Sequence, residues 1–178
     1  MSRIRITGGE WRSRLIKVAD SVKVLRPTPD RVRVTLFNWL GQDLTGLSCL
    51  DLFAGSGILG FEAASRGAGP VTLVEQDQGA YTVLRQNAQA LGSPNLELLR
   101  TDAVRFADST TQRYDLVFLD PPFRQAWMER IAPRLPRLTN PGARLYVEAE
   151  HPVESLGAWH SVRQGRAGQV FYQLLEQQ

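Results

Sequence analysis

From residue 47 to residue 148 the chain alternates short apolar stretches with helix-like ones, and this alternation constrains the fold more than any other feature. Strands are expected at 47–53, 71–75, 96–99, 116–119 and 145–148. Helices are expected at 58–66, 78–91 and 126–135. Strands and helices in this order are typical of a parallel sheet with helices on both faces. The sequence therefore predicts an α/β fold.

Both ends of the chain depart from this alternation of strands and helices. Apolar stretches at 4–6 and 15–18 surround Gly8-Gly9, which predicts a small β-hairpin. The prolines of 26–29 should interrupt regular structure before a helix that Gly41 ends. Stretches around 161–163 and 170–175 suggest a closing antiparallel pair. We expect one domain over residues 1–178, with 1–25 as a basic β-extension and 26–178 as the catalytic core.

Positive charge is concentrated at the start of the chain. Residues 1–33 hold nine of the 21 basic side chains and three acids, a net +6, so the remaining residues sum to −3. Nineteen of the 21 are arginine, which binds phosphate in a bidentate manner and stacks on bases. The pattern favours contact with a nucleic acid over an ordinary solvated surface. The candidate RNA-binding residues are Arg3, Arg5, Arg12, Arg14, Arg26, Arg31 and Arg33.

Several classes of protein are disfavoured by what the chain contains. No apolar run reaches the roughly 20 residues of a membrane span, and no signal-peptide stretch follows Met1, so a cytoplasmic protein is expected. Cys49 is the only cysteine and lies inside an expected strand, which disfavours a disulfide and thiolate catalysis. His151 and His160 lack metal-ligand spacing, so we expect no metal.

A glycine-rich turn follows the first expected strand of the core. Residues 54–60 read Ala-Gly-Ser-Gly-Ile-Leu-Gly, a G-x-G-x-x-G pattern between a strand and a helix, as in dinucleotide-binding folds. The pattern alone fits a nicotinamide cofactor as well as S-adenosylmethionine. Asp51 precedes the turn, and a carboxylate there suits an amine-bearing ligand better than a pyrophosphate. The sequence therefore favours S-adenosylmethionine.

Two further acids follow the next strands. Glu75 ends the second strand, where it can accept hydrogen bonds from ribose hydroxyls. Asp102 follows the third strand, where it is either an acceptor for the adenine amino group or a helix cap. The full set of candidate cofactor-binding residues is Asp51, Phe53, Ala54, Gly55, Ser56, Gly57, Glu75, Asp102, Ala103 and Asp120.

The fourth expected strand leads into Asp120-Pro121-Pro122-Phe123, the candidate catalytic residues. The two prolines stiffen the loop, and the aromatic ring can stack on a planar group. Fixed acceptors beside a stacking face suit an amino group on a heteroaromatic or amide plane. Asp120 and the Pro121 carbonyl would accept its hydrogens and direct the nitrogen lone pair at a methyl group, a catalysis by positioning. The proton would leave through Asp120 or to water.

Several segments resemble the RsmD-type ribosomal RNA methyltransferases. The likeness lies in 6–12 (Ile-x-Gly-Gly-x-Trp-Arg), 26–33 (Arg-Pro-Thr-x-Asp-Arg-Val-Arg), 36–40 (Leu-Phe-Asn-Trp-Leu), 50–57, 120–123 and 168–170. It covers nearly the whole chain, and the first two segments are the most specific to this group.

The resemblance implies a Rossmann-like class I methyltransferase fold. Its sheet would have seven mostly parallel strands, one of them antiparallel, and a small N-terminal β-hairpin would extend it. The resemblance also implies methylation of guanine N2 in 16S ribosomal RNA, at guanine 966, on the small (30S) ribosomal subunit. Asp51, Glu75 and Asp102 would bind the cofactor, 120–123 would hold the guanine, and the chain would act as a monomer. The alternatives are an amino-methyltransferase for DNA adenine or a protein amide, a nicotinamide oxidoreductase, and a non-catalytic RNA-binding module.

Overall fold

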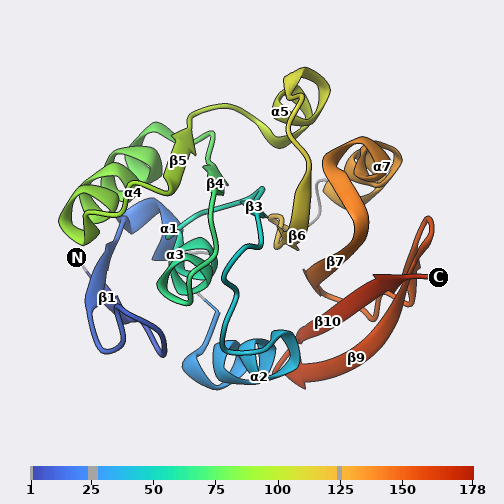
Figure 1. Ribbon diagram of the computed structural model, residues 1–178, viewed down its shortest axis with the longest axis horizontal. Coiled ribbons are helices and arrows are strands. Elements are labelled where there is room, and N and C mark those ends of the chain that lie inside the picture. The colour runs from blue at the N-terminus through green and yellow to red at the C-terminus, as the bar shows by residue number, and fades with distance from the viewer. Residues whose placement is uncertain (1, 24–27, 124–125) are drawn as a thin grey trace.

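A twisted sheet runs through the structure, a computed structural model that describes residues 2–23, 28–123 and 126–178 (Figure 1). Its strands are β3 (Cys49–Asp51), β4 (Val71–Val74), β5 (Leu96–Leu99), β6 (Tyr114–Leu119), β7 (Thr139–Ala149), β8 (Ser155–Leu156), β9 (Trp159–Ala167) and β10 (Val170–Gln177). They lie in the order β5-β4-β3-β6-β7-β10-β9-β8. The predicted alternation of strands and helices is confirmed.

The strand directions follow from the pairings. β5, β4, β3, β6 and β7 pair in parallel, whereas β10 pairs antiparallel with both β7 and β9. β9 therefore runs in the same direction as the parallel strands, and β10 is the one reversed strand among these seven. This confirms the predicted class I methyltransferase sheet. β8 adds an eighth strand of two residues at the edge, antiparallel to β9, which the sequence did not predict.

Helices cover both faces of the sheet. They are α1 (Asp20–Lys23), α2 (Asp30–Leu40), α3 (Ile58–Ser65), α4 (Gln78–Leu91), α5 (Ala103–Ser109), α6 (Trp127–Ile131) and α7 (Leu135–Leu138). The apolar side chains of α2, α3 and α4 pack on one face, and those of α5, α6 and α7 pack on the other. Alternate residues of each strand point to opposite faces of the sheet. Phe118 and Tyr146 pack with α2, α3 and α4, and Leu119 and Val147 pack with α5, α6 and α7.

Two helix predictions were wrong in detail. The expected helix at 126–135 is divided into α6, a 3-10 turn at Ala132–Arg134, and α7. Pro133 and Pro136 stand near the starts of the last two pieces, where a proline is tolerated because the first N–H groups have no helical partner. The short helix α5 was not among the predicted helices, although a helix cap was one of the two interpretations of Asp102. Asp102 caps it by accepting from the Arg105 N–H at 2.7 Å.

The predicted N-terminal hairpin is confirmed. β1 (Ser2–Arg5) and β2 (Leu15–Val18) pair antiparallel beside α3 and α4. Ile6, Trp11 and Ile16 are buried in the same core cluster as α2 and α3. At Gly9 the backbone has φ +79°, and a Cβ there would lie 2.1 Å from the Ser65 carbonyl oxygen, so only glycine fits. The hairpin thus shares a hydrophobic core with α2, α3 and the sheet.

A buried ionic cluster centres on Glu62 of α3. Its carboxylate accepts from Arg33 Nε at 2.9 Å, from Arg66 Nη1 at 2.8 Å and from the Thr7 Oγ1 hydroxyl at 2.7 Å. Arg33 is only 1% exposed and also donates to Asp30 at 2.7 Å. This contact joins the hairpin, α2 and α3. It also corrects the prediction for Arg33, because a buried guanidinium that is fully engaged cannot contact RNA.

Across residues 2–23, 28–123 and 126–178 no helix has the length and apolar character that crossing a membrane requires.

Candidate active site

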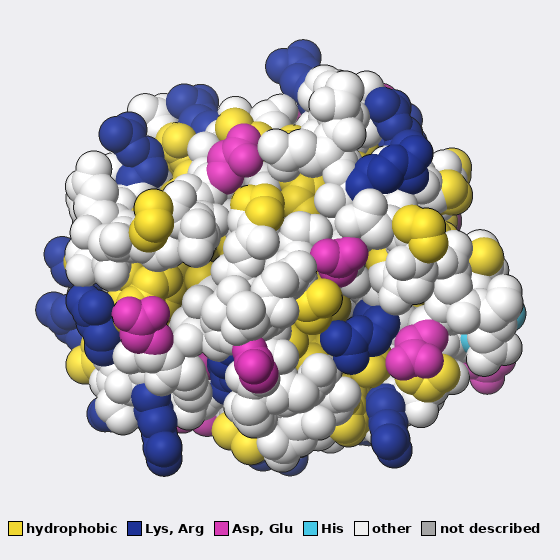
Figure 2. Space-filling view, in the orientation of Figure 1, with side chains coloured by type: hydrophobic (Ala, Val, Ile, Leu, Met, Phe, Trp, Pro, Cys, Tyr) yellow, Lys and Arg dark blue, Asp and Glu magenta, His cyan; other side chains and the backbone are white. Residues whose placement is uncertain are grey.

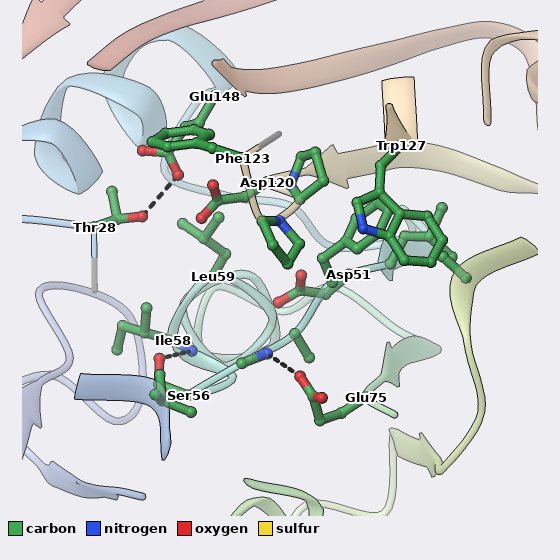
Figure 3. A pocket seen from close by; sticks show the side chains of 18 of the residues that line it. Thr28, Asp51, Ser56, Ile58, Leu59, Glu75, Asp120, Phe123, Trp127 and Glu148 are labelled. Atoms are coloured by element: carbon green, nitrogen blue, oxygen red, sulfur yellow. Dashed lines mark hydrogen bonds between the residues drawn. The ribbon is translucent and has the colours of Figure 1, made fainter. Parts of the chain in front are cut away.

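A cavity of about 530 Å³ lies at the carboxyl ends of β3, β4, β6 and β7 (Figure 3). Its size falls in the range of roughly 300–1,000 Å³ that is usual for small-molecule sites. In parallel sheets this edge is where ligands bind, because the loops that follow the strands converge there. The start of α2 and the turn between β9 and β10 also line the cavity.

The turn after β3 forms one wall. Gly57 has φ +83°, which residues with a side chain rarely adopt, and a Cβ on it would lie 2.4 Å from Leu84 Cδ1, so another residue would strain the backbone and displace the Leu84 side chain. Ser56 Oγ accepts from the Ile58 N–H at the first turn of α3. Phe53, Ala54, Gly55 and Ser56 line the cavity, whereas Gly57 does not and shapes the turn from behind.

Asp51, the last residue of β3, is 2% exposed and points into the cavity (Figure 3). One of its oxygens accepts from the Gly60 N–H at 3.1 Å. Desolvation raises the pKa of this carboxyl to about 7; the Gly60 hydrogen bond lowers the pKa, and the nearby Glu75 and Glu148 carboxyls raise it. A cationic ligand would stabilise the ionised form of this buried carboxyl, which no solvent stabilises.

Glu75 and Asp102 stand on the neighbouring strand ends. The Glu75 carboxylate accepts from the Gly55 N–H at 2.9 Å and from the Asp77 N–H at 2.7 Å, which holds both oxygens at the cavity wall. Burial raises its pKa. Each carboxylate oxygen retains a lone pair for a ligand hydroxyl. Asp102 is both the cap of α5 and a wall residue, beside Ala103, so the two interpretations of this residue are compatible.

The loop after β6 forms the opposite wall. Asp120, Pro121, Pro122 and Phe123 all line the cavity, and the Phe123 ring is 40% exposed at its rim. Asp120 is half-buried, and desolvation raises its pKa well above the usual range. The Glu148 carboxyl also raises it, through its charge and through a hydrogen bond with Asp120. The loop therefore presents a carboxyl, carbonyls and an aromatic ring to one space.

The lining residues that were not predicted as site residues include Thr28, Trp127 and Glu148. Trp127 packs edge-on against Phe53, with ring centroids 5.4 Å apart. Glu148, near the end of β7, is 4% exposed and accepts from the Thr28 hydroxyl at 2.8 Å. A charged residue at the carboxyl end of an apolar parallel strand was a signal for Glu148. Thr28 lies in the Arg-Pro-Thr segment that carries the family likeness, whereas no signal in the sequence marked Trp127.

Comparison with known proteins decides the family. The family described as Conserved hypothetical protein 95 matches residues 4–176. The Ribosomal RNA small subunit methyltransferase D of Escherichia coli K12 is 40% identical over 184 residues, covering 99% of this chain and 91% of its own. The chain belongs to the RsmD family. A solved Escherichia coli protein named as a methyltransferase superposes with a TM-score of 0.89 at 39% identity, covering 99% of both chains.

The cofactor of this RsmD-family chain is S-adenosylmethionine. An RNA methyltransferase from Salinibacter ruber, solved with S-adenosylhomocysteine, shares the fold with a TM-score of 0.67 at 20% identity, covering 85% of this chain and 93% of its own. The cavity fits this group: Asp51 offers a buried carboxyl for the amine of the methionine part, and Glu75 offers fixed acceptors for the ribose.

The predicted RNA-binding residues differ in their exposure in this RsmD-family protein. Arg3, Arg5, Arg12 and Arg14 of the hairpin and Arg31 of α2 are exposed. Arg14 also donates to the Ala90 carbonyl at 2.9 Å, which ties it to the end of α4. Arg26 lies outside the described residues, and Arg33 is buried in the ionic cluster.

Binding of S-adenosylhomocysteine should depend on pH through Asp51. A pKa of about 7 means that the carboxyl is protonated in acid and must ionise to hold the ligand's ammonium group. Affinity should therefore rise with pH up to about 7, by at most roughly tenfold per unit, and then level off. Calorimetric titration between pH 5.5 and 8.5 measures it. We expect Asp51→Asn to bind weakly with a flat profile, and a sloping profile in that variant would refute the assignment.

Proposed function

We propose that this chain transfers a methyl group from S-adenosylmethionine to the exocyclic N2 of a guanine in 16S ribosomal RNA of the small (30S) ribosomal subunit. By likeness to the family, the target is guanine 966. The observation that carries the proposal is the position of 120–123, whose acceptors and aromatic ring face the same cavity as the cofactor-binding turn. The close relatives named for small-subunit ribosomal RNA support this choice of substrate.

The loop compensates for a weak nucleophile. The lone pair of an exocyclic amine is delocalised into the ring. Asp120 and the Pro121 carbonyl accept the two amino hydrogens and orient the lone pair toward the cavity, while Phe123 stacks on the base. S-adenosylmethionine supplies a methyl group on a positively charged sulfur. The new N–C bond forms as the S–C bond breaks, and the excess proton on nitrogen then passes to Asp120 or to water.

The hairpin supplies a positively charged surface for the RNA. Figure 2 shows Lys and Arg side chains around the outline of one face, including its left side, where the hairpin lies in Figure 1. Exposed arginines there can contact phosphates and orient the RNA, while the base enters the cavity. The target base must leave any stack, which is easiest in a single-stranded loop. We propose that residues 1–178 act as one domain, as a monomer, in the cytoplasm.

Mapping of the methylated nucleotide tests the proposal. The chain is incubated with labelled S-adenosylmethionine and small subunits from bacteria that lack an enzyme of this family. We expect label in 16S ribosomal RNA, recovered after nuclease digestion as N2-methylguanine and located by mass spectrometry at a single position. Label in N6-methyladenine when DNA is offered in place of the subunits, or label that protease releases from the subunits, would instead support the rival amino-methyltransferase. RNA binding without any transfer would indicate a non-catalytic module.

A further inference from the structure

Glu148 is a second carboxyl beside the catalytic loop. β6 and β7 pair in parallel with Leu119 opposite Val147, so Asp120 and Glu148 occupy the next positions on adjacent strands. Strands lie roughly 4.8 Å apart, and alternation directs both residues to the sheet face that carries Phe118 and Tyr146. Both line the cavity and share a hydrogen bond. Figure 3 shows the carboxyl groups of Asp51, Asp120 and Glu148 in succession across it.

Thr28 holds the Glu148 side chain in place. Its hydroxyl, 5% exposed as a residue, donates to Glu148 Oε2 at 2.8 Å from the segment just before α2. Within the described ranges the ion pairs engage Asp30, Glu62 and Asp108, and none engages Glu148. Burial of a carboxylate without a cation is unfavourable unless hydrogen-bond donors compensate. The Thr28 hydroxyl and the contact with Asp120 leave room for further donors on the cavity side.

Guanine carries hydrogen-bond donors that can pair with the carboxyl oxygens of Asp120 and Glu148. Its Watson–Crick edge presents N1–H next to the N2 amino group, so two neighbouring sites donate. Adenine presents an unprotonated N1 as an acceptor beside its N6 amino group, and a carboxylate facing that nitrogen would repel it. Enzymes that act on an extruded base recognise it by hydrogen bonds to this edge. Two adjacent carboxyls can therefore accept both hydrogen bonds from guanine, whereas one of them would face the N1 acceptor of adenine unfavourably.

We propose that Glu148, fixed by Thr28, accepts the N1–H of the target guanine while Asp120 accepts from N2, so that Glu148 determines the choice of guanine over a base without N1–H. The inference rests on the proposed function. It assigns a role to the threonine of the Arg-Pro-Thr segment, which neither cofactor binding nor the methyl transfer itself requires.

A base analogue can test whether Glu148 recognises the N1–H of guanine or only supports the fold of the protein. 2-Aminopurine keeps the N2 amino group of guanine and lacks N1–H and O6. Small subunits are assembled from ligated 16S RNA that carries either base at the mapped target position, and kcat/KM is measured for each. The wild type should prefer guanine by about a hundredfold, because a buried acceptor is left unpaired by the analogue. Glu148→Gln should reduce this preference at least tenfold, since the amide N–H can donate to the unprotonated N1.

The controls distinguish the possible failures. The exposed Glu154 serves as the matched control, and Glu154→Gln should keep the wild-type preference. A thermal shift with S-adenosylhomocysteine should show that Glu148→Gln folds and binds cofactor. If that variant fails to fold, the Thr28 variants provide the test. Thr28→Val should reduce the preference for guanine over 2-aminopurine severalfold, and Thr28→Ser should preserve this preference. A preference unchanged in Glu148→Gln, or in Thr28→Val, would overturn this inference alone. Absence of wild-type transfer to the guanine substrate would overturn the proposed function as well.

Discussion

Asp120→Ala should lower the single-turnover rate of methyl transfer by at least about a hundredfold, the usual effect of removing a preorganised hydrogen-bonding group. The variant loses the acceptor that orients the amino group and a carboxyl that can take up its proton. Asp120→Asn keeps a carbonyl oxygen that can accept one amino hydrogen but cannot take up a proton. We expect its rate to lie between those of the wild type and the alanine variant. Rapid quenching with labelled cofactor measures all three.

Cofactor binding provides the control for this series. The turn after β3 and the Glu75 acceptors do not depend on Asp120, so S-adenosylhomocysteine should still raise the melting temperature of both variants. Both should fold, because replacement of a carboxyl whose pKa is raised by desolvation removes an unfavourable buried charge. Transfer by Asp120→Ala at the wild-type rate would exclude the proposed role of this residue.

Glu62→Ala should have the largest effect on stability, a loss of about 3–5 kcal/mol in the free energy of unfolding. Glu62 is fully buried, and its removal takes away the carboxylate that pairs with Arg66 and, among the described residues, leaves Arg33 paired with Asp30 alone. It also releases Thr7, whose N–H and hydroxyl both donate to Glu62 and attach the hairpin to α3. Urea denaturation followed by circular dichroism measures the change.

The chain contains a matched ion pair on its surface. Arg134 Nε lies 2.7 Å from Asp108 Oδ1, the same kind of contact, but the two side chains are 30% and 52% exposed. Solvent screens such a pair, so Asp108→Ala should leave the free energy of unfolding nearly unchanged. Equal effects of Glu62→Ala and Asp108→Ala would mean that burial does not govern the strength of these contacts.

Local patterns predicted most of the fold because each reports a local physical requirement. The strands of the core were predicted from apolar runs, and the hairpin from two such runs around Gly8-Gly9. The breaks around Pro133 and Pro136 were missed, since apolar periodicity continues across them. The two-residue strand β8 and the seven-residue helix α5 were too short to show a period.

The sequence by itself determined the elements of the cavity wall that lie close together along the chain. Asp51 and the glycine-rich turn are neighbours in sequence, as are Asp120 to Phe123, and parallel strands bring their carboxyl ends to one edge. Only the tertiary structure decided which charged residues are buried. It placed Arg33 against Glu62, 29 positions away, and Thr28 against Glu148, 120 positions away. The physical reason is that the charge of a residue is a local property, whereas its solvent exposure and its partners depend on how distant segments pack.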